Sequence, residues 1–218
     1  SIGTALVLGV LIQVALRKRE RSFRLLLGPL LAMNVVLMPT LLLRQTGRLA
    51  ELDAGLRRAA EEAEIDPTRE VVVVTLPNAD LAYNLLSARR VLLGAPPPVA
   101  WWLLSAAPFD HRLSRPAADR LEIEVQGGQL LGPDSQRLFR PSTWPMRAGS
   151  RFQQGSLQVE VLEADRVGPR RVAFTFAASL DDPRYQLLAW QEGALRRLAL
   201  PEVGQSIRLP SSDTPYSF

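Results

Sequence analysis

The feature that most constrains this chain is a pair of uncharged apolar runs near its start, at residues 1–16 and 25–43. A helix needs about 20 apolar residues to span a membrane, and the second run has 19. The first run is shorter and begins at a residue other than Met, so we expect a truncated span in a chain that is trimmed, processed or the tail of a longer protein. Together the runs predict a membrane α-helical hairpin over residues 1–46.

The segment between the two runs sets the predicted orientation of the hairpin. Five of the residues at 17–24 are basic, and short loops rich in Lys and Arg remain in the cytoplasm. Everything after Leu43 is then predicted to be extracytoplasmic, although Arg44 and Arg48 oppose this orientation. A signal peptide would carry its basic residues before the apolar run. A helical hairpin buried inside a protein is the other alternative, and the charged loop disfavours it.

Asn34 lies near the middle of the second run. Polar side chains at that depth usually face other helices rather than lipid. Asn34 is therefore a candidate for contact with a further membrane helix, in a longer chain or in a partner subunit. A bond to the backbone of its own helix agrees equally well with the sequence.

Charge is divided unevenly along the chain. The chain has 26 basic and 22 acidic residues. Residues 1–48 hold seven of the basic residues and one of the acidic residues, so the rest of the chain holds 19 basic and 21 acidic residues. The positive excess is therefore a topology signal rather than a basic binding surface. Nucleic-acid recognition requires clustered basic residues, so we predict no nucleic-acid partner. The expected partners are the lipid bilayer and other membrane helices or membrane-protein subunits.

Residues 47–66 are predicted to form an amphipathic connector helix that ends at Asp66-Pro67. Apolar residues recur on one face at helical spacing. These residues are Leu49, Leu52, Leu56, Ala59, Ala60 and Ala63.

Residues 67–210 are predicted to form an α+β domain, with a flexible tail at 211–218. A strand at 71–76, a helix capped by Asn78 and ended by Gly94, and a strand at 99–104 make one βαβ-like unit. From about residue 109 a period-two pattern predicts a mostly antiparallel small β-barrel or sandwich. Hairpin turns are expected at 126–128 and at 192–193. The predicted fold class is a membrane α-helical hairpin followed by an α+β soluble domain.

Composition excludes several kinds of active site. The chain has no Cys and one His, which rules out thiolate metal sites, Cys nucleophiles and multi-His metal sites. It also lacks the glycine-rich loops that bind nucleotides. We therefore predict no catalytic residue, no cofactor and no metal.

Two groups of side chains are weaker candidates for chemistry. His111 would act with Ser105 or Ser114 as nucleophile and Asp110 as orienting acid, but no G-x-S-x-G elbow is present. His111 alternates in phase with apolar residues, which predicts a half-buried strand position. The pair Asp181-Asp182 would ligate a hard cation or act as two carboxylates, but its place between strands predicts an ordinary turn.

Three tryptophans are candidates for partner or interface contact: Trp101, Trp102 and Trp144. Adjacent residues of a strand point to opposite faces. At most one of Trp101 and Trp102 is therefore expected in the core, which leaves the other for an interface. Trp144 lies in a loop-like, Pro-rich stretch, where an exposed aromatic side chain would bind a partner.

Four segments carry a family resemblance: VVVVTLPNAD at 71–80, GSLQVEVLEAD at 155–165, RRVAFTFAASLDDPRYQLLAW at 170–190 and LPEVGQSIRL at 200–209. In this combination the chain resembles, over about residues 25–210, the C-terminal part of uncharacterised bacterial polytopic membrane proteins. The resemblance implies preceding membrane helices and a bacterial inner (cytoplasmic) membrane location. It implies no activity and no catalytic residues.

These features predict a membrane-anchored structural or assembly subunit with an extracytoplasmic interaction domain and no catalytic site of its own. One alternative is the C-terminal tail of a polytopic transporter or membrane enzyme whose active site lies in upstream helices. A hydrolase that uses His111 or the Asp181-Asp182 pair is a third.

Overall fold

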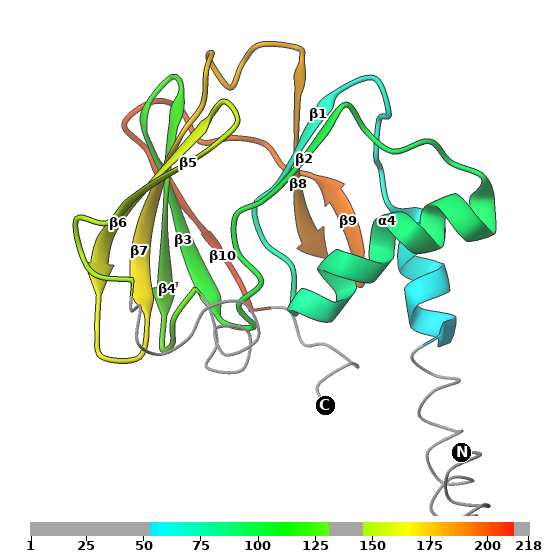
Figure 1. Cartoon of the computed structure of the whole chain (residues 1–218), viewed down its shortest axis with the longest axis horizontal. Helices are drawn as coiled ribbons and strands as arrows, with labels where there is room; N and C mark the ends of the chain where they lie inside the picture. The colour runs from blue at the N-terminus through cyan, green and yellow to red at the C-terminus, as the bar shows by residue number, and fades with distance from the viewer. Residues whose placement is uncertain (1–52, 131–145, 212–218) are drawn as a thin grey trace, which may run out of the picture. The chain divides into compact units, whose positions relative to one another are not determined.

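A computed structural model describes residues 53–130 and 146–211, which form two β-sheets and two helical segments (Figure 1). Sheet A has the strand order β2-β1-β8-β9, with β1 at Glu70–Val73, β2 at Ala100–Leu103, β8 at Tyr185–Gln191 and β9 at Ala194–Arg197. Sheet B has the order β10-β3-β4-β7-β6-β5. Its strands are β3 (Asp110–Ala117), β4 (Arg120–Gln126), β5 (Arg151–Gln154), β6 (Leu157–Ala164), β7 (Pro169–Thr175) and β10 (Ser206–Leu209).

The helix α4, at Ala79–Leu93, connects β1 to β2. Its first turn is capped by Asn78, whose side chain accepts a hydrogen bond from the Leu81 amide at 2.8 Å. Its last turn ends at Gly94, where φ is 64° and a residue without Cβ avoids strain. Because β1 and β2 pair in parallel, the predicted βαβ unit and both of its helix ends are confirmed.

We expect Asn78→Ala to lower the free energy of unfolding by about 1 kcal/mol, because it removes the acceptor that caps α4. Asn78→Ser keeps an acceptor and should stay within a few tenths of a kcal/mol of the unaltered chain. Urea unfolding followed by tryptophan fluorescence measures both. An equal loss in the two variants would contradict the capping role.

Sheet B is antiparallel throughout, and its strands β3 and β4 alternate buried and accessible side chains as period two predicts. Strand β5 departs from this pattern, since all four of its residues are exposed. In sheet A the hairpin between β8 and β9 is confirmed at Glu192-Gly193, where both φ angles are positive, at 52° and 85°, as a type I′ turn requires. The hairpin predicted at 126–128 is wrong. The two neighbours of β4 are β3 and β7, and the next described strand of the chain, β5, does not pair with it.

Sheet A is the middle one of three layers (Figure 1). One of its faces packs against the helical segments, with Val71, Val73 and Leu188 among the buried residues. The opposite face packs against sheet B, with Val72 and Leu187 facing Leu113, Ile123 and Phe174 among others. Sheet A is therefore buried on both faces, which explains the continuous Val71–Val74 run.

The connector segment is helical at 53–62, and from Ala54 onward it belongs to the compact unit Ala54–Phe218. Three residues of the predicted apolar face, Ala59, Ala60 and Ala63, are buried against sheet A, and Leu56 is half-buried there. Leu49 and Leu52 lie outside the described residues. The helix ends four residues earlier than predicted, and the chain then runs along β9, where the Glu64 amide donates to the Leu195 carbonyl at 3.1 Å.

No helix within residues 53–130 and 146–211 is long and apolar enough to cross a membrane. The predicted fold class, a membrane helical hairpin followed by a domain, is therefore corrected to a sheet-dominated fold. The same finding overturns the predicted inner-membrane location and the extracytoplasmic placement that depended on it. The two apolar runs that led to these predictions lie outside the described residues. Hydropathy alone was an insufficient basis, because a helical hairpin buried in protein carries the same pattern.

Candidate functional site

His111 and Ser105 form a buried pair between the two sheets. The Ser105 hydroxyl lies 2.8 Å from His111 Nε2, and each residue is only 2% exposed. Burial lowers the pKa of His111 to about 4, against the smaller raising effects of the Phe109 backbone and the nearby Asp110 charge. The ring is therefore neutral at pH 7, and its Nε2 gives the buried Ser105 hydroxyl a hydrogen-bond partner.

The other members of the predicted triad lie elsewhere. Asp110 points to the surface, where it binds Arg208 and the Ser211 amide, and the hydrogen bond from Arg208 lowers its pKa. Ser114 lies further along β3, opposite Glu122. Among the described residues, the Ser105–His111 pair is therefore buried and has no carboxylate hydrogen-bonded to it.

Asp181 and Asp182 do not act as a carboxylate pair. Asp181 accepts a hydrogen bond at 2.6 Å from Arg115, which is 4% exposed, and this bond lowers the pKa of Asp181. Asp182 instead accepts from the Arg184 amide at 2.9 Å, which closes the turn before β8. The turn predicted here is confirmed. In the described part of the chain, no group of three or more His, Asp or Glu could hold a metal.

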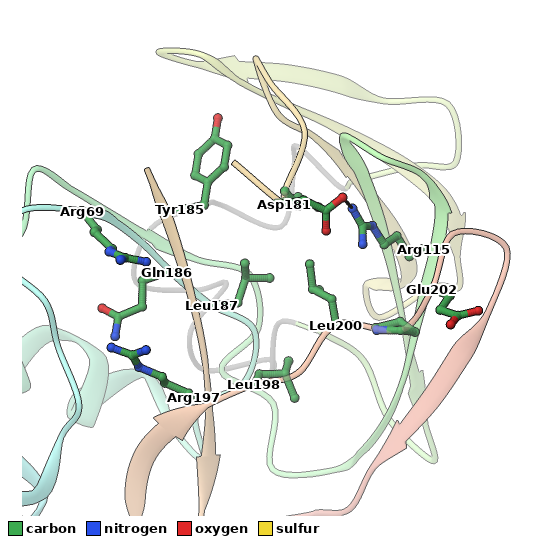
Figure 2. Close-up of a pocket in the computed structure, with 12 residues that line it drawn as sticks. Arg69, Arg115, Asp181, Tyr185, Gln186, Leu187, Arg197, Leu198, Leu200 and Glu202 are labelled. Atoms are coloured by element: carbon green, nitrogen blue, oxygen red, sulfur yellow. Dashed lines mark hydrogen bonds and ion pairs between the residues drawn. The ribbon is translucent and has the colours of Figure 1, made fainter. Parts of the chain in front are cut away.

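A cleft of about 450 Å³ opens beside these residues, between β3 of sheet B and β8 and β9 of sheet A (Figure 2). Its apolar lining is formed by Leu187, Leu198 and Leu200. Arg69, Gln186 and Arg197 lie at one end, and Asp181, Arg115 and Glu202 lie at the other.

The cationic side chains of this cleft already have acidic partners within the fold. Arg69 lies 3.1 Å from Asp66, Arg115 lies 2.6 Å from Asp181, and Arg197 lies 4.0 Å from Glu64. An anionic ligand would have to compete with these carboxylates. Each of the three cations has a carboxylate within 4.0 Å, although Arg115 Nε is buried without a hydrogen-bond partner among the described residues.

The outer face of sheet B is covered by ion pairs in the same way. Arg171 lies 2.6 Å from Glu122, and Glu160 lies between Arg151, at 2.8 Å, and Arg120, at 3.4 Å. This face therefore has the mixed charge of a solvated surface.

The two adjacent tryptophans lie on opposite faces of β2, as predicted. Trp101 packs against the helical side of sheet A, and Trp102 packs toward sheet B, where its indole N–H lies 3.4 Å from Glu70 Oε2. Both side chains are half-buried. A partner contact by either one stays a prediction. Asn34 and Trp144 lie outside the described residues.

One part of the described surface is apolar. Sequence reasoning singled out its two tryptophans, Trp101 and Trp102, but missed the exposed residues at 91–99. Residues 91–109 contain no charged side chain. Four of the seven exposed large hydrophobic side chains of the described residues lie at the start of this stretch, with Val91 82% and Val99 69% exposed. We call residues 91–99 together with β2 the apolar edge. The uncharged run itself was the available sequence signal.

The apolar edge includes one border of sheet A. Each sheet ends in two edge strands, and three of these four strands carry Arg side chains: Arg196 and Arg197 in β9, Arg151 in β5 and Arg208 in β10. Charged edge strands resist pairing with other chains. The fourth edge strand, β2, has the sequence AWWL and lacks this protection.

Comparison with protein-family models, with curated proteins and with solved structures finds no match. The resemblance to the C-terminal part of bacterial polytopic membrane proteins therefore stays a prediction.

Proposed function

We propose that this protein is a non-catalytic assembly module that binds a protein partner through the apolar edge. The observation that carries the proposal is the combination of exposed Val91 and Val99 with an uncharged edge strand in one continuous segment. Monomeric proteins rarely expose large contiguous apolar patches, and such patches commonly mark interaction sites. Addition of a strand to an open sheet edge is a common mode of protein recognition.

The other candidate sites support this choice by their own geometry. The Ser105–His111 pair is closed to solvent, Asp181 is bound to Arg115, and the cleft between the sheets has its cations paired. None of these groups presents an accessible, unpaired side chain for chemistry. The apolar edge requires no such group, because its binding free energy would come from burial of apolar surface and from backbone hydrogen bonds.

Site-specific photo-crosslinking in the producing cells tests the proposal. A benzophenone amino acid replaces Val99 in one variant of the full chain and Val91 in another. We expect both variants to give a crosslinked product of one defined mass, whose protein component is then identified by mass spectrometry.

The matched control places the same photoreactive residue at Val203, a 52% exposed side chain in the turn before β10. It has similar exposure but lies outside the apolar edge, so it should give no such product. The absence of a product at both 91 and 99, or an identical product at 203, would overturn the proposed function.

A further inference from the structure

The backbone of β2 presents hydrogen-bonding groups on the side away from β1. The amide of Leu104 donates to the Val73 carbonyl of β1 at 2.9 Å. Amide directions alternate along a strand, so those of Trp101 and Leu103 point away from β1. In the described part of the chain no strand pairs with that side of β2.

When two copies of one chain pair about a two-fold axis, the surface that the axis crosses must be complementary to itself. Residues near the axis face their own copies, so a charged side chain there meets a like charge. Edge strands β5, β9 and β10 carry Arg and would place like charges together. The sequence of β2 is uncharged and therefore complementary to itself.

From this self-complementarity we infer that the occupant of the apolar edge is a second copy of the same chain, whose β2 pairs antiparallel with the first. This inference rests on the proposed function and names its partner. Two-fold pairing uses the open edge of both copies, so the assembly closes at two chains rather than growing into a fibre. The two four-stranded A sheets become one continuous sheet.

The outward-facing groups fix the register of this pairing. Trp101 of one copy exchanges two backbone hydrogen bonds with Leu103 of the other, and Leu103 does so with Trp101, because only these two positions of β2 face outward. The axis then passes beside Trp102. The exposed Val99 borders the paired strand, where the second copy would cover it.

Amide hydrogen exchange of the full chain at low and high protein concentration tests the pairing without a substitution. We expect the Trp101 and Leu103 amides to exchange at least about tenfold more slowly at high concentration, where they are bonded across the axis. The Trp102 and Leu104 amides, which face β1, should be protected equally at both concentrations. In sedimentation velocity the concentrated sample should have twice the 24.1 kDa mass of one chain.

Val99→Asp places a carboxylate at the border of the paired strand, so we expect self-association to weaken by at least about tenfold. Val203→Asp introduces the same charge at an exposed position elsewhere and should leave it unchanged. Sedimentation as a single chain at all concentrations, or a dimer unaffected by Val99→Asp, would overturn the inference. A photo-crosslink from Val99 to a different protein would also overturn it while leaving the proposed function in place, whereas no crosslink would remove both.

Discussion

Lowering the pH from 7 to 5 should reduce the free energy of unfolding by about 2 kcal/mol, and a single side chain should account for the loss. His111 is the only His in a chain without Cys, so no other side chain has an ordinary pKa between 5 and 8. Burial between the sheets lowers the pKa of His111 from 6.5 to about 4. Urea unfolding at pH 7, 6 and 5 measures the loss.

The direction follows from which state binds the proton. In the unfolded chain His111 takes up a proton near pH 6.5, whereas in the folded protein it does so only near pH 4. Between these values the unfolded state binds more protons, so acidification favours unfolding. The stabilisation is fully present above pH 6.5 and is lost progressively as the pH falls toward 4. Below that range Asp110 and Asp181, whose pKa values are lowered by Arg208 and Arg115, begin to contribute.

His111→Gln is the matched variant for this effect. Its side-chain amide can still bond the Ser105 hydroxyl but cannot take up a proton in this range. We expect it to cost about 1 kcal/mol at pH 7, and its free energy of unfolding should change by less than about 0.5 kcal/mol between pH 7 and 5. If the free energy of unfolding of the unaltered chain did not change with pH, or if it changed equally in His111→Gln, burial would not depress the pKa of His111.

Local features of the fold were predictable because short stretches of sequence determine them. The Asn78 cap, the Gly94 end of α4 and the turn at Glu192-Gly193 each depend on a few neighbouring residues and their φ angles. The opposite orientations of Trp101 and Trp102 follow from strand geometry alone. Pairing of β1 with β2 follows because a helix joins them directly.

Pairings between distant segments were not predictable from such patterns. β8 pairs with β1, where Glu70 lies opposite Tyr185, and β10 pairs with β3, where Leu209 lies opposite His111. The hairpin expected at 126–128 failed for the same reason, since the neighbours of β4 are β3 and the distant β7. The turn residues indicate where the chain reverses direction, but they do not determine which strand pairs with β4.

The apolar edge depends both on a local sequence feature and on long-range strand pairing. The uncharged stretch at 91–109 is visible in the sequence, but its significance depends on β2 being an edge strand. That position results from β8 occupying the other side of β1. The opposite border of sheet A differs because Glu64 bonds to Leu195 there, which again joins residues far apart in the sequence.

Gln186 holds the segment that covers this opposite border, and its replacement by Leu should destabilise the fold strongly. The side chain is 4% exposed; it accepts from the Asp66 amide at 2.8 Å and donates to the Glu64 carbonyl. Leu fills a similar volume but bonds neither backbone group. Each buried backbone group left without a hydrogen bond costs about 1–3 kcal/mol, so we expect a loss of about 2–4 kcal/mol in the free energy of unfolding.

Gln153→Leu is the matched control, because Gln153 occupies an exposed position in β5 and its side-chain amide donates to the nearby Gly155 carbonyl at 3.3 Å. It should change the free energy of unfolding by less than about 0.5 kcal/mol. Hydrogen exchange separates a local from a general effect, since Gln186→Leu should accelerate exchange of the Glu64 and Asp66 amides more than that of the β4 amides. Equal costs for the two variants would mean that water replaces the amide of Gln186, and that the cover over β9 is held by the Glu64–Leu195 bond and the packing of Ala59, Ala60 and Ala63.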